Sequence, residues 1–433
     1  KLTRTFGSGG SVVKWTWSSW FKVSYIGGNE QVFFSSFTDT SNFSYIKING
    51  NNKLEFRAKT SGSTILRYTL ARRFRDPSAF MHLVVALDTT DGTAGDRIKI
   101  WINGVRETVF DASTAPAEDA VTLMNSAAAH AIGYAGDGTD YFQGYMSQVC
   151  FVDNVQYDAD QFGEFDEDSG TWKAIDVSGL TFGATSFFLD FADSGDLGDD
   201  ESGNSNDWTE VNLAATDQSL DTCTNNFATF NPLVKPVAAV PLSEGNLRGV
   251  FPGSWTALPA NFGVTKGKWY WEAKNVTSGQ NAFMGVVTEN QPWDASTPYN
   301  ETTGVVLYGP GGRKTVDNTS NDGFFATLSS GQIVGVALDL DSSTKTIQFS
   351  VNGTDTPNST PVDLPSTFDD VFIFPYFIGN SSSATSNWEL NFGSPAYAIS
   401  SGNADGNGYG DFEYAVPSGF LALCTKNLSA VNS

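Results

Sequence analysis

The sequence predicts an all-β fold class with two tandem jelly-roll-like β-sandwiches. Two stretches, 80–105 and 332–354, share one pattern, in which an aliphatic run, a polar turn and an alternating strand lead to Asn-Gly. Asn-Gly supplies the positive φ angles of a type I′ hairpin turn. Because the two copies lie about 250 residues apart, roughly one large β-domain, each predicts a sandwich of its own.

The composition supports the same fold class. A chain of 433 residues suggests two or three domains at roughly 150 residues each. Its 33 Phe, 14 Tyr, 11 Trp and 43 Gly favour strands and turns over helices. The best helical candidate, 117–131, is interpreted as a loop that runs into a strand. We find no apolar run of about 18 residues that predicts a membrane span, and no signal-peptide pattern.

The charge of the chain argues against nucleic acid as a partner. The 48 acidic residues outnumber the 25 Lys and Arg, which leaves a net charge of −23. Such a field repels DNA and anionic membranes, and it keeps a protein soluble at high local density. The three cysteines, Cys150, Cys223 and Cys424, have no metal-site spacing. They are interpreted as buried thiols of a protein made in a reducing cytoplasm.

Composition shifts along the chain divide it into four parts. Strands with one buried face begin at Trp15 and Trp17, where aromatic residues alternate with polar ones. The predicted parts are a first sandwich at 1–180, an acidic connector at 181–245, a second sandwich at 246–393 and a C-terminal extension at 394–433. Residues 158–171 read as an exit loop. Within the connector, Phe187–Val211 packs back on the first sandwich, bridges it to the second or forms a free acidic linker; its alternation argues against the free linker.

The first part resembles the laminin-G/concanavalin-like fold. The resemblance lies in WTWSSWFK, MHLVVALD, IKIWINGV, HAIGYAG and YFQGYMSQVCFVD. It is closest to the version common in virion proteins of tailed phages from marine bacteria, which also carry segments like QFGEFDEDSGTW and DDESGNSNDWT. The second part resembles a SPRY domain through GKWYWE, the DLD…FSVNG hairpin and a closing NFG.

These resemblances imply a non-enzymatic phage virion protein on the particle surface, as a tail or head appendage or a decoration protein. Its expected partners are other virion proteins, further copies of itself in a homo-oligomer, and a host-surface glycan or protein receptor. A purely architectural protein that contacts other subunits alone is the first alternative. A glycan depolymerase is the second.

Residues suited to catalysis are few. Retaining glycosidases need two carboxylates on one strand face, about 5 Å apart. The nearest match, Glu164–Asp168, lacks a third acid in register and the apolar spacers of a core strand, so it predicts a solvated loop. The two histidines, His82 and His130, read as structural. Residues 309–315 lack the glycine before the lysine that a phosphate-binding loop requires.

Two clusters have the oxygen-rich composition that calcium prefers. One contains Asp137 and Asp140. The other contains Asp199, Asp200, Asn204 and Asn206. They are either ligands of a structural calcium ion, of the kind that laminin-G-like domains often hold, or ordinary turn residues of an acidic protein. No other cofactor is expected.

Aromatic residues outside strand alternation are the candidates for ligand contact. Trp293, Tyr299 and Tyr308 flank loops of the second sandwich, where SPRY domains usually place their binding surface. Flat rings stack on sugar faces and on apolar side chains. Burial in a core or at a subunit contact is the alternative for all three.

Overall fold

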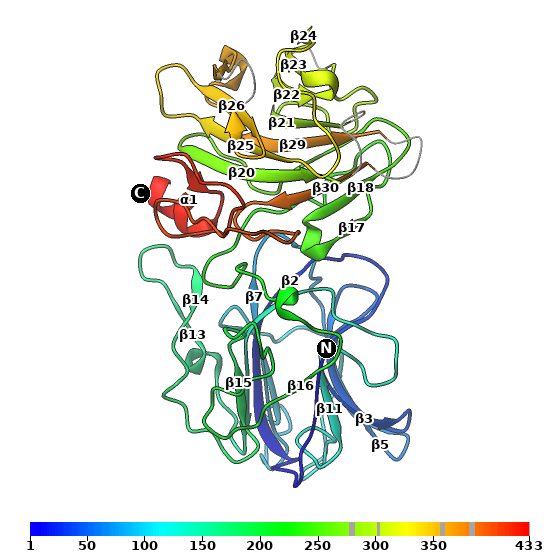
Figure 1. The fold of residues 1–433 in the computed structure, drawn as a ribbon. Coiled ribbons are helices and arrows are strands. Elements are labelled where there is room, and N and C mark those ends of the chain that lie inside the picture. Colours follow the sequence, from blue (N-terminus) through cyan, green and yellow to red (C-terminus); the bar gives the residue numbers. More distant parts are fainter. Residues whose placement is uncertain (277–281, 301–303, 356–359, 381–385, 433) are drawn as a thin grey trace. The chain divides into compact units, whose positions relative to one another are not determined.

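The computed structural model describes residues 1–276, 282–300, 304–355, 360–380 and 386–432 (Figure 1). The chain divides into two compact units, Lys1–Thr224 and Asn225–Ser433. Strands account for 41% of the structure and helices for 6%, far below the roughly 30–35% helix of an average globular domain. The predicted fold class, two tandem β-sandwiches, is confirmed. None of the described helices is long and apolar enough to cross a membrane.

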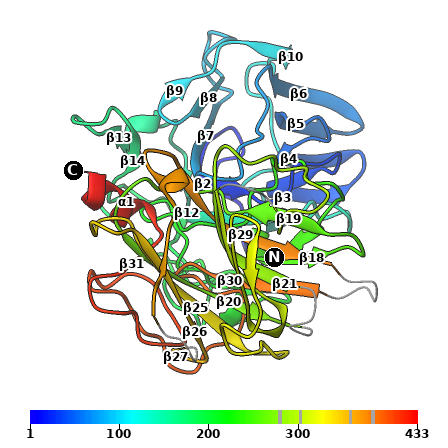
Figure 2. The ribbon, with the colours of Figure 1, turned by 90° about the horizontal axis from the view of Figure 1, so that it is seen from above.

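The first unit packs an eight-stranded antiparallel sheet against a six-stranded one. The larger sheet contains, in spatial order, β10 (Phe110–Thr114), β6 (Ser63–Leu70), β5 (Leu54–Thr60), β4 (Asn42–Ile48), β3 (Gln31–Asp39), β11 (Ala129–Ile132), β1 (Leu2–Thr5) and β16 (Thr209–Glu210). The smaller contains β15 (Phe187–Leu189), β12 (Gly144–Asp153), β2 (Lys14–Val23), β7 (Met81–Asp88), β8 (Ile98–Ile102) and β9 (Val105–Arg106). Figure 2 shows β3 to β6 side by side.

Strand β2 is buried on both faces. Trp15, Trp17 and Phe21 point into the core between the sheets. The opposite face of the small sheet is covered by residues 155–182, which include η1 (Ala159–Gln161) and the hairpin of β13 (Gly163–Phe165) and β14 (Trp172–Ala174). The interpretation of 158–171 as an exit loop is therefore wrong in part, because Phe162 is buried against this outer face.

Residues 181–224 belong to the first unit. Strand β15 pairs with β12, and β16 pairs with β1. Between them, Trp208 enters the core and contacts Phe187 edge-on, with ring centroids 4.9 Å apart. A short helix, η2 (Ala215–Asp217), follows. Phe187–Val211 thus packs on the first sandwich. The boundary between the two units in the chain falls at 224/225, inside the stretch that the sequence predicts as a connector.

The second unit is also a two-sheet sandwich. One sheet contains β17 (Leu242–Ser243), β18 (Arg248–Phe251), β30 (Ser386–Asn391), β20 (Lys268–Asn275), β25 (Ile333–Asp339), β26 (Thr346–Val351) and β27 (Thr354–Asp355), with β28 (Val362–Asp363) on β26 and β31 (Leu421–Ala422) parallel to β20. The other contains β19 (Thr256–Pro259), β29 (Ile373–Gly379), β21 (Ala282–Thr288), β22 (Val305–Gly309), β23 (Arg313–Val316) and β24 (Thr319–Asn321). The described helices are η3 (Glu244–Asn246), η4 (Pro310–Gly312), η5 (Ser366–Phe368) and α1 (Thr425–Asn432).

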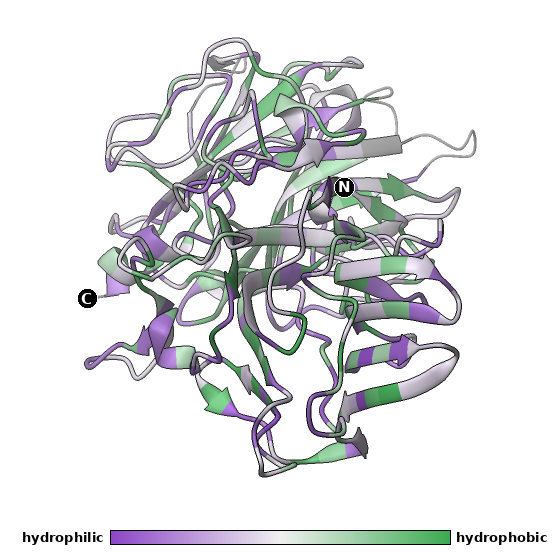
Figure 3. Ribbon diagram, turned by 90° about the horizontal axis from the view of Figure 1, so that it is seen from below, coloured by the Kyte–Doolittle hydropathy of each residue, from purple (hydrophilic) through white to green (hydrophobic). Residues whose placement is uncertain are grey.

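Strand periodicity and turn chemistry account for this architecture. Green and purple bands follow one another along several strands in Figure 3, as period-2 burial requires. Both predicted hairpin turns have positive φ at each central residue: 48° and 74° at Asn103 and Gly104, 49° and 70° at Asn352 and Gly353. A side chain at Gly104 would also collide with the Trp172 ring, because a Cβ there lies 2.3 Å from it.

Candidate binding surface

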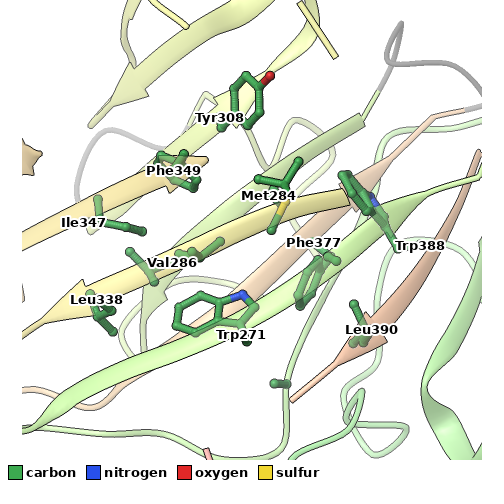
Figure 4. Packing of buried hydrophobic residues seen from close by; sticks show 14 of the residues in the cluster. Trp271, Met284, Val286, Tyr308, Leu338, Ile347, Phe349, Phe377, Trp388 and Leu390 are labelled. Atoms are coloured by element: carbon green, nitrogen blue, oxygen red, sulfur yellow. The ribbon is translucent and has the colours of Figure 1, made fainter. Parts of the chain in front are cut away.

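The six-stranded sheet of the second unit has aromatic residues on both faces. Its inner face contributes Met284 and Val286 of β21 to the core, which Figure 4 shows around Trp271 and Phe377. Its outer face contributes Phe283 and Val287 of the same strand to a second hydrophobic cluster. Alternate residues of the neighbouring strands β22 and β29 join them in this cluster: Val305, Leu307, Tyr376 and Ile378. Because side chains alternate along a strand, one position decides which face a ring occupies.

Tyr308 lies on the inner face, which corrects its interpretation as a ligand contact. It is 2% exposed. Its ring packs against Phe349, with the ring centroids 5.7 Å apart (Figure 4), and against Phe325, with the centroids 5.0 Å apart. Its hydroxyl donates a 2.6 Å hydrogen bond to the carbonyl oxygen of Ala326, and burial raises its pKa. Tyr308 is two residues from Val306, another inner-face residue of β22. The period-2 alternation of VVLYG therefore predicts that Tyr308 faces the core.

Trp293 and Tyr299 lie on the outer face, on the segment that follows β21. Tyr299 stacks on Phe283 with ring centroids 5.2 Å apart and an interplanar angle of 2°. Trp293 meets Phe374 edge-on at 5.9 Å. Both are half-buried hydrophobic residues packed over the buried part of the cluster. The structure therefore places these two predicted residues together on one sheet face.

Two further half-buried rings, Trp255 and Phe374, join Trp293 and Tyr299 on this face. Trp255 approaches Tyr299 with centroids 4.5 Å apart. We call these four residues the aromatic surface. Sequence analysis missed Trp255 and Phe374. Phe377, a core residue, is three positions after Phe374 on the same strand, so alternation predicts that Phe374 faces away from the core. Partly exposed flat rings on a buried aromatic base can stack on sugar rings or apolar side chains.

The first calcium candidate is a turn near a cavity of about 450 Å³ in the first unit. The cavity is lined in part by Glu30 and Asp140. Burial, followed by the nearby charges of Glu30 and Asp137, raises the pKa of Asp140. Glu30 is also paired with the ammonium group of Lys47, and Asp137 accepts hydrogen bonds from Thr139.

In the second candidate, the side chains bind the chain itself. Buried Asp200 accepts hydrogen bonds from the backbone N–H groups of Phe188, Ser202 and Asn206, at 2.8–2.9 Å. The amides of Asn204 and Asn206 donate to backbone carbonyls within residues 183–186, whereas Asp199 is exposed. Among the residues that the structure describes, no group of three or more His, Cys, Asp or Glu could hold a metal ion. Calcium binding therefore stays a prediction at both positions.

His82 lies within hydrogen-bond distance of Ser18, an arrangement that superficially suggests a nucleophile and its base. The indole N–H of Trp172 donates to Nδ1 of His82 at 3.0 Å. Because a neutral imidazole carries one N–H, its proton is on Nε2, which donates to the Ser18 hydroxyl at 2.8 Å. A base would have to accept from that hydroxyl instead. Burial lowers the pKa of His82 to about 3.

The other residues considered for catalysis also have structural contacts. His130 accepts a hydrogen bond from the N–H of Asn125 at Nε2 and donates from Nδ1 to the carbonyl oxygen of Ala128. Glu164 and Asp166 both pair with the exposed Lys173 at 3.2 Å. Hydrogen bonds from the backbone and side chain of Ser169 lower the pKa of Asp166 to about 2, opposite to the shift of a general acid.

A comparison with protein families classifies part of the first unit. Residues 6–159 match the Laminin_G_3 model, described as the concanavalin A-like lectin/glucanases superfamily. The first unit thus contains a concanavalin-like domain, and the domain content indicates a binding function. None of the curated proteins matches the chain.

Several solved structures are similar to parts of the chain. The SPRY domain of human HERC1 is 21% identical, covers 37% of this chain and 96% of its own, and has a TM-score of 0.29. The native heptameric SAP-like pentraxin from Limulus polyphemus is 14% identical and covers 36% and 71%, with a TM-score of 0.27. The TRIM65 PSpry domain is 14% identical and covers 40% and 90%, with a TM-score of 0.29.

Proposed function

We propose that the protein is a non-enzymatic binding protein of a phage virion surface, and that it contacts a host-surface glycan or protein through the aromatic surface. The observation that carries the binding proposal is the layering of four half-buried rings over buried rings of the same sheet face. Neighbouring core strands hold the base of this surface, so little conformational entropy is lost when a ligand stacks on it.

The virion location rests on the sequence resemblance to marine tailed-phage proteins. The net charge of −23 supports it in two ways. It keeps many copies soluble at high local density, and it disfavours contact with nucleic acid. The proposed partners are other virion proteins and further copies of the chain, because repeated weak sites give an appendage avidity.

The absence of catalysis is part of the proposal. His82 donates to Ser18 where a base would accept, and Glu164 and Asp166 share one exposed lysine on a hairpin. Neither arrangement offers a nucleophile and a proton carrier around a common substrate position.

Substitutions of the aromatic surface test the binding proposal. Trp293→Ala and Trp255→Ala should each weaken adsorption to host cells or purified host polysaccharide by about 1–3 kcal/mol, as for other aromatic anchors. Phe165→Ala is the matched control, since it removes an exposed ring, 51% accessible, from the other unit. It should leave adsorption unchanged.

Thermal denaturation of the same variants distinguishes binding from packing. A ring that only completes a core costs roughly 3–5 kcal/mol of stability when it is removed. Unchanged adsorption together with a large fall in Tm would remove the aromatic surface as a ligand site. The architectural alternative, in which the sandwiches contact other subunits alone, would then be the better account.

A further inference from the structure

Lys22 is a buried cation on the outer face of the small sheet of the first unit. It lies on β2 opposite Tyr145 of β12. It alternates with Trp17 and Phe21, which face the core, so its side chain projects to the other side of the sheet. The ammonium nitrogen lies 4.5 Å from the ring centroid of Tyr145 and 5.3 Å from that of Phe80. A lysine is rarely buried to this degree unless it is paired.

The partner of Lys22 is Asp221, which lies near the C-terminal end of the same unit in sequence. Its carboxylate contacts the Lys22 ammonium, and both side chains are 1% exposed. The two residues are 199 positions apart in sequence. The other ion pairs of the described chain each have at least one side chain that is 12% exposed or more. The Lys22–Asp221 contact is therefore an outlier among them.

A fully buried ion pair is costly as long as both charges persist. Each ion loses its hydration, and the mutual attraction offsets this loss only in part. Burial lowers the pKa of Lys22, while the Asp221 and Asp76 carboxylates act in the opposite direction. A lower pKa increases the fraction of neutral amine, which is the nucleophilic form. The fold also holds the nitrogen against the carboxyl group, which replaces a bimolecular encounter with an intramolecular one.

We propose that Lys22 and Asp221 condense within the folded unit to form an amide bond. The ammonium and the carboxylate first exchange a proton, which leaves an amine and a carboxylic acid. The Nζ lone pair attacks Cγ of Asp221, the N–C bond forms, and one C–O bond breaks. The hydroxyl of the acid leaves as water with one of the two amine protons, and the amide nitrogen keeps the other. No oxidant, cofactor or further reactant is needed, and the product contains no buried charge.

The bond would close a covalent ring around nearly the whole first unit. It joins a central strand to the segment immediately before the unit boundary at 224/225. A cross-link between residues this distant restricts the unfolded chain strongly. The first unit would then resist unfolding and proteolysis as an appendage exposed outside a cell must.

Mass spectrometry of the denatured full chain tests the proposal. The purified protein should be lighter than its sequence mass by one water, and a tryptic digest should contain a branched peptide that joins Lys22 to Asp221. The Lys53–Asp111 pair is an internal control, because Asp111 is 48% exposed and the pair should yield separate peptides. A full sequence mass with no branched peptide overturns the proposal.

Two variants identify the reacting atoms. Asp221→Asn should still form the bond but lose one ammonia in place of water. Lys22→Arg keeps the positive charge without the amine and should have its full sequence mass. A water loss that persists in Lys22→Arg places the dehydration elsewhere and rejects the assignment. Because the wild-type mass and branched peptide already decide the main question, a variant that fails to fold does not affect that result.

Discussion

In both units, a segment from later in the chain covers the outer face of a central, Trp-rich strand. Each of these strands has one buried charged side chain under the covering segment, and the two charges have different kinds of partner. In the first unit, Lys22 of β2 meets the opposite charge of Asp221. In the second, Glu272 of β20 is buried beneath residues 397–414 and meets neutral donors.

The donors to Glu272 are numerous. They are the hydroxyls of Tyr270 and Tyr397, the amide of Asn391 and the backbone N–H groups of Glu413 and Tyr414, at 2.8–3.2 Å. Burial raises the pKa of Glu272, and the hydrogen bonds offset part of that effect. A carboxylate with many donors holds a segment reversibly, whereas an ammonium against a carboxylate can also react.

The C-terminal residues of the chain are part of the second sandwich. Residues 394–433 were predicted as an extension. Their segment supplies three of the five donors to Glu272, and β31 pairs with β20. These residues therefore form a layer of the second sandwich.

The largest expected effect is the loss of the Glu272 carboxylate. Glu272→Ala leaves five donors without their acceptor in a buried site, and we expect it to lower the free energy of unfolding by about 3–5 kcal/mol. Urea denaturation measures the loss, and hydrogen exchange should show faster opening of residues 397–414. Glu389→Ala, on the same sheet with its charge paired to the more exposed Arg248, is the control. If Glu272→Ala lowers the free energy of unfolding by less than about 1 kcal/mol, the five donors find other acceptors when the Glu272 carboxylate is removed.

The second effect is a pH response that differs between the units. The pKa values of His82 and His130 fall from 6.5 to about 3 and about 4 on burial, and both histidines belong to the first unit. Between pH 6.5 and 4 the unfolded state binds more protons, so stability is lost as the pH falls. At pH 5 the loss is about 2 kcal/mol per histidine.

Hydrogen exchange at pH 7 and pH 5, corrected for intrinsic rates, measures this difference. The first unit should lose protection. Glu272, with its raised pKa, contributes stability that is present below pH 4.5 and is lost as the pH rises, so it does not weaken the second unit on acidification. His130→Gln should remove part of the response of the first unit. Equal losses in both units would contradict the assignment to the histidines.

The smallest expected effect concerns an exposed charge cluster. Glu164→Gln removes one of two carboxylates on Lys173, whose side chain is 48% exposed, and should leave the melting temperature nearly unchanged, because water and salt screen exposed ion pairs. Host polysaccharide incubated with either form should yield no new reducing ends. Release by the wild type that disappears in Glu164→Gln would make this hairpin a catalytic site and support the depolymerase alternative.

The sequence by itself determined the features that depend on local backbone chemistry. Alternation placed Trp15, Trp17 and Phe21 in one core, and Asn-Gly at 103–104 and 352–353 specified two hairpins through their positive φ angles. The period-2 rule also contained the inward direction of Tyr308, although its place beside a loop suggested the opposite.

The tertiary structure alone decided which distant residues meet. Asp221 lies 199 residues from Lys22, and the donors to Glu272 come from up to 142 residues away. A local pattern carries no information about these separations, because burial of a charge depends on which later segment covers the sheet face. The aromatic surface has the same origin: Trp255, Trp293 and Phe374 become neighbours when a sheet brings their strands and loops together.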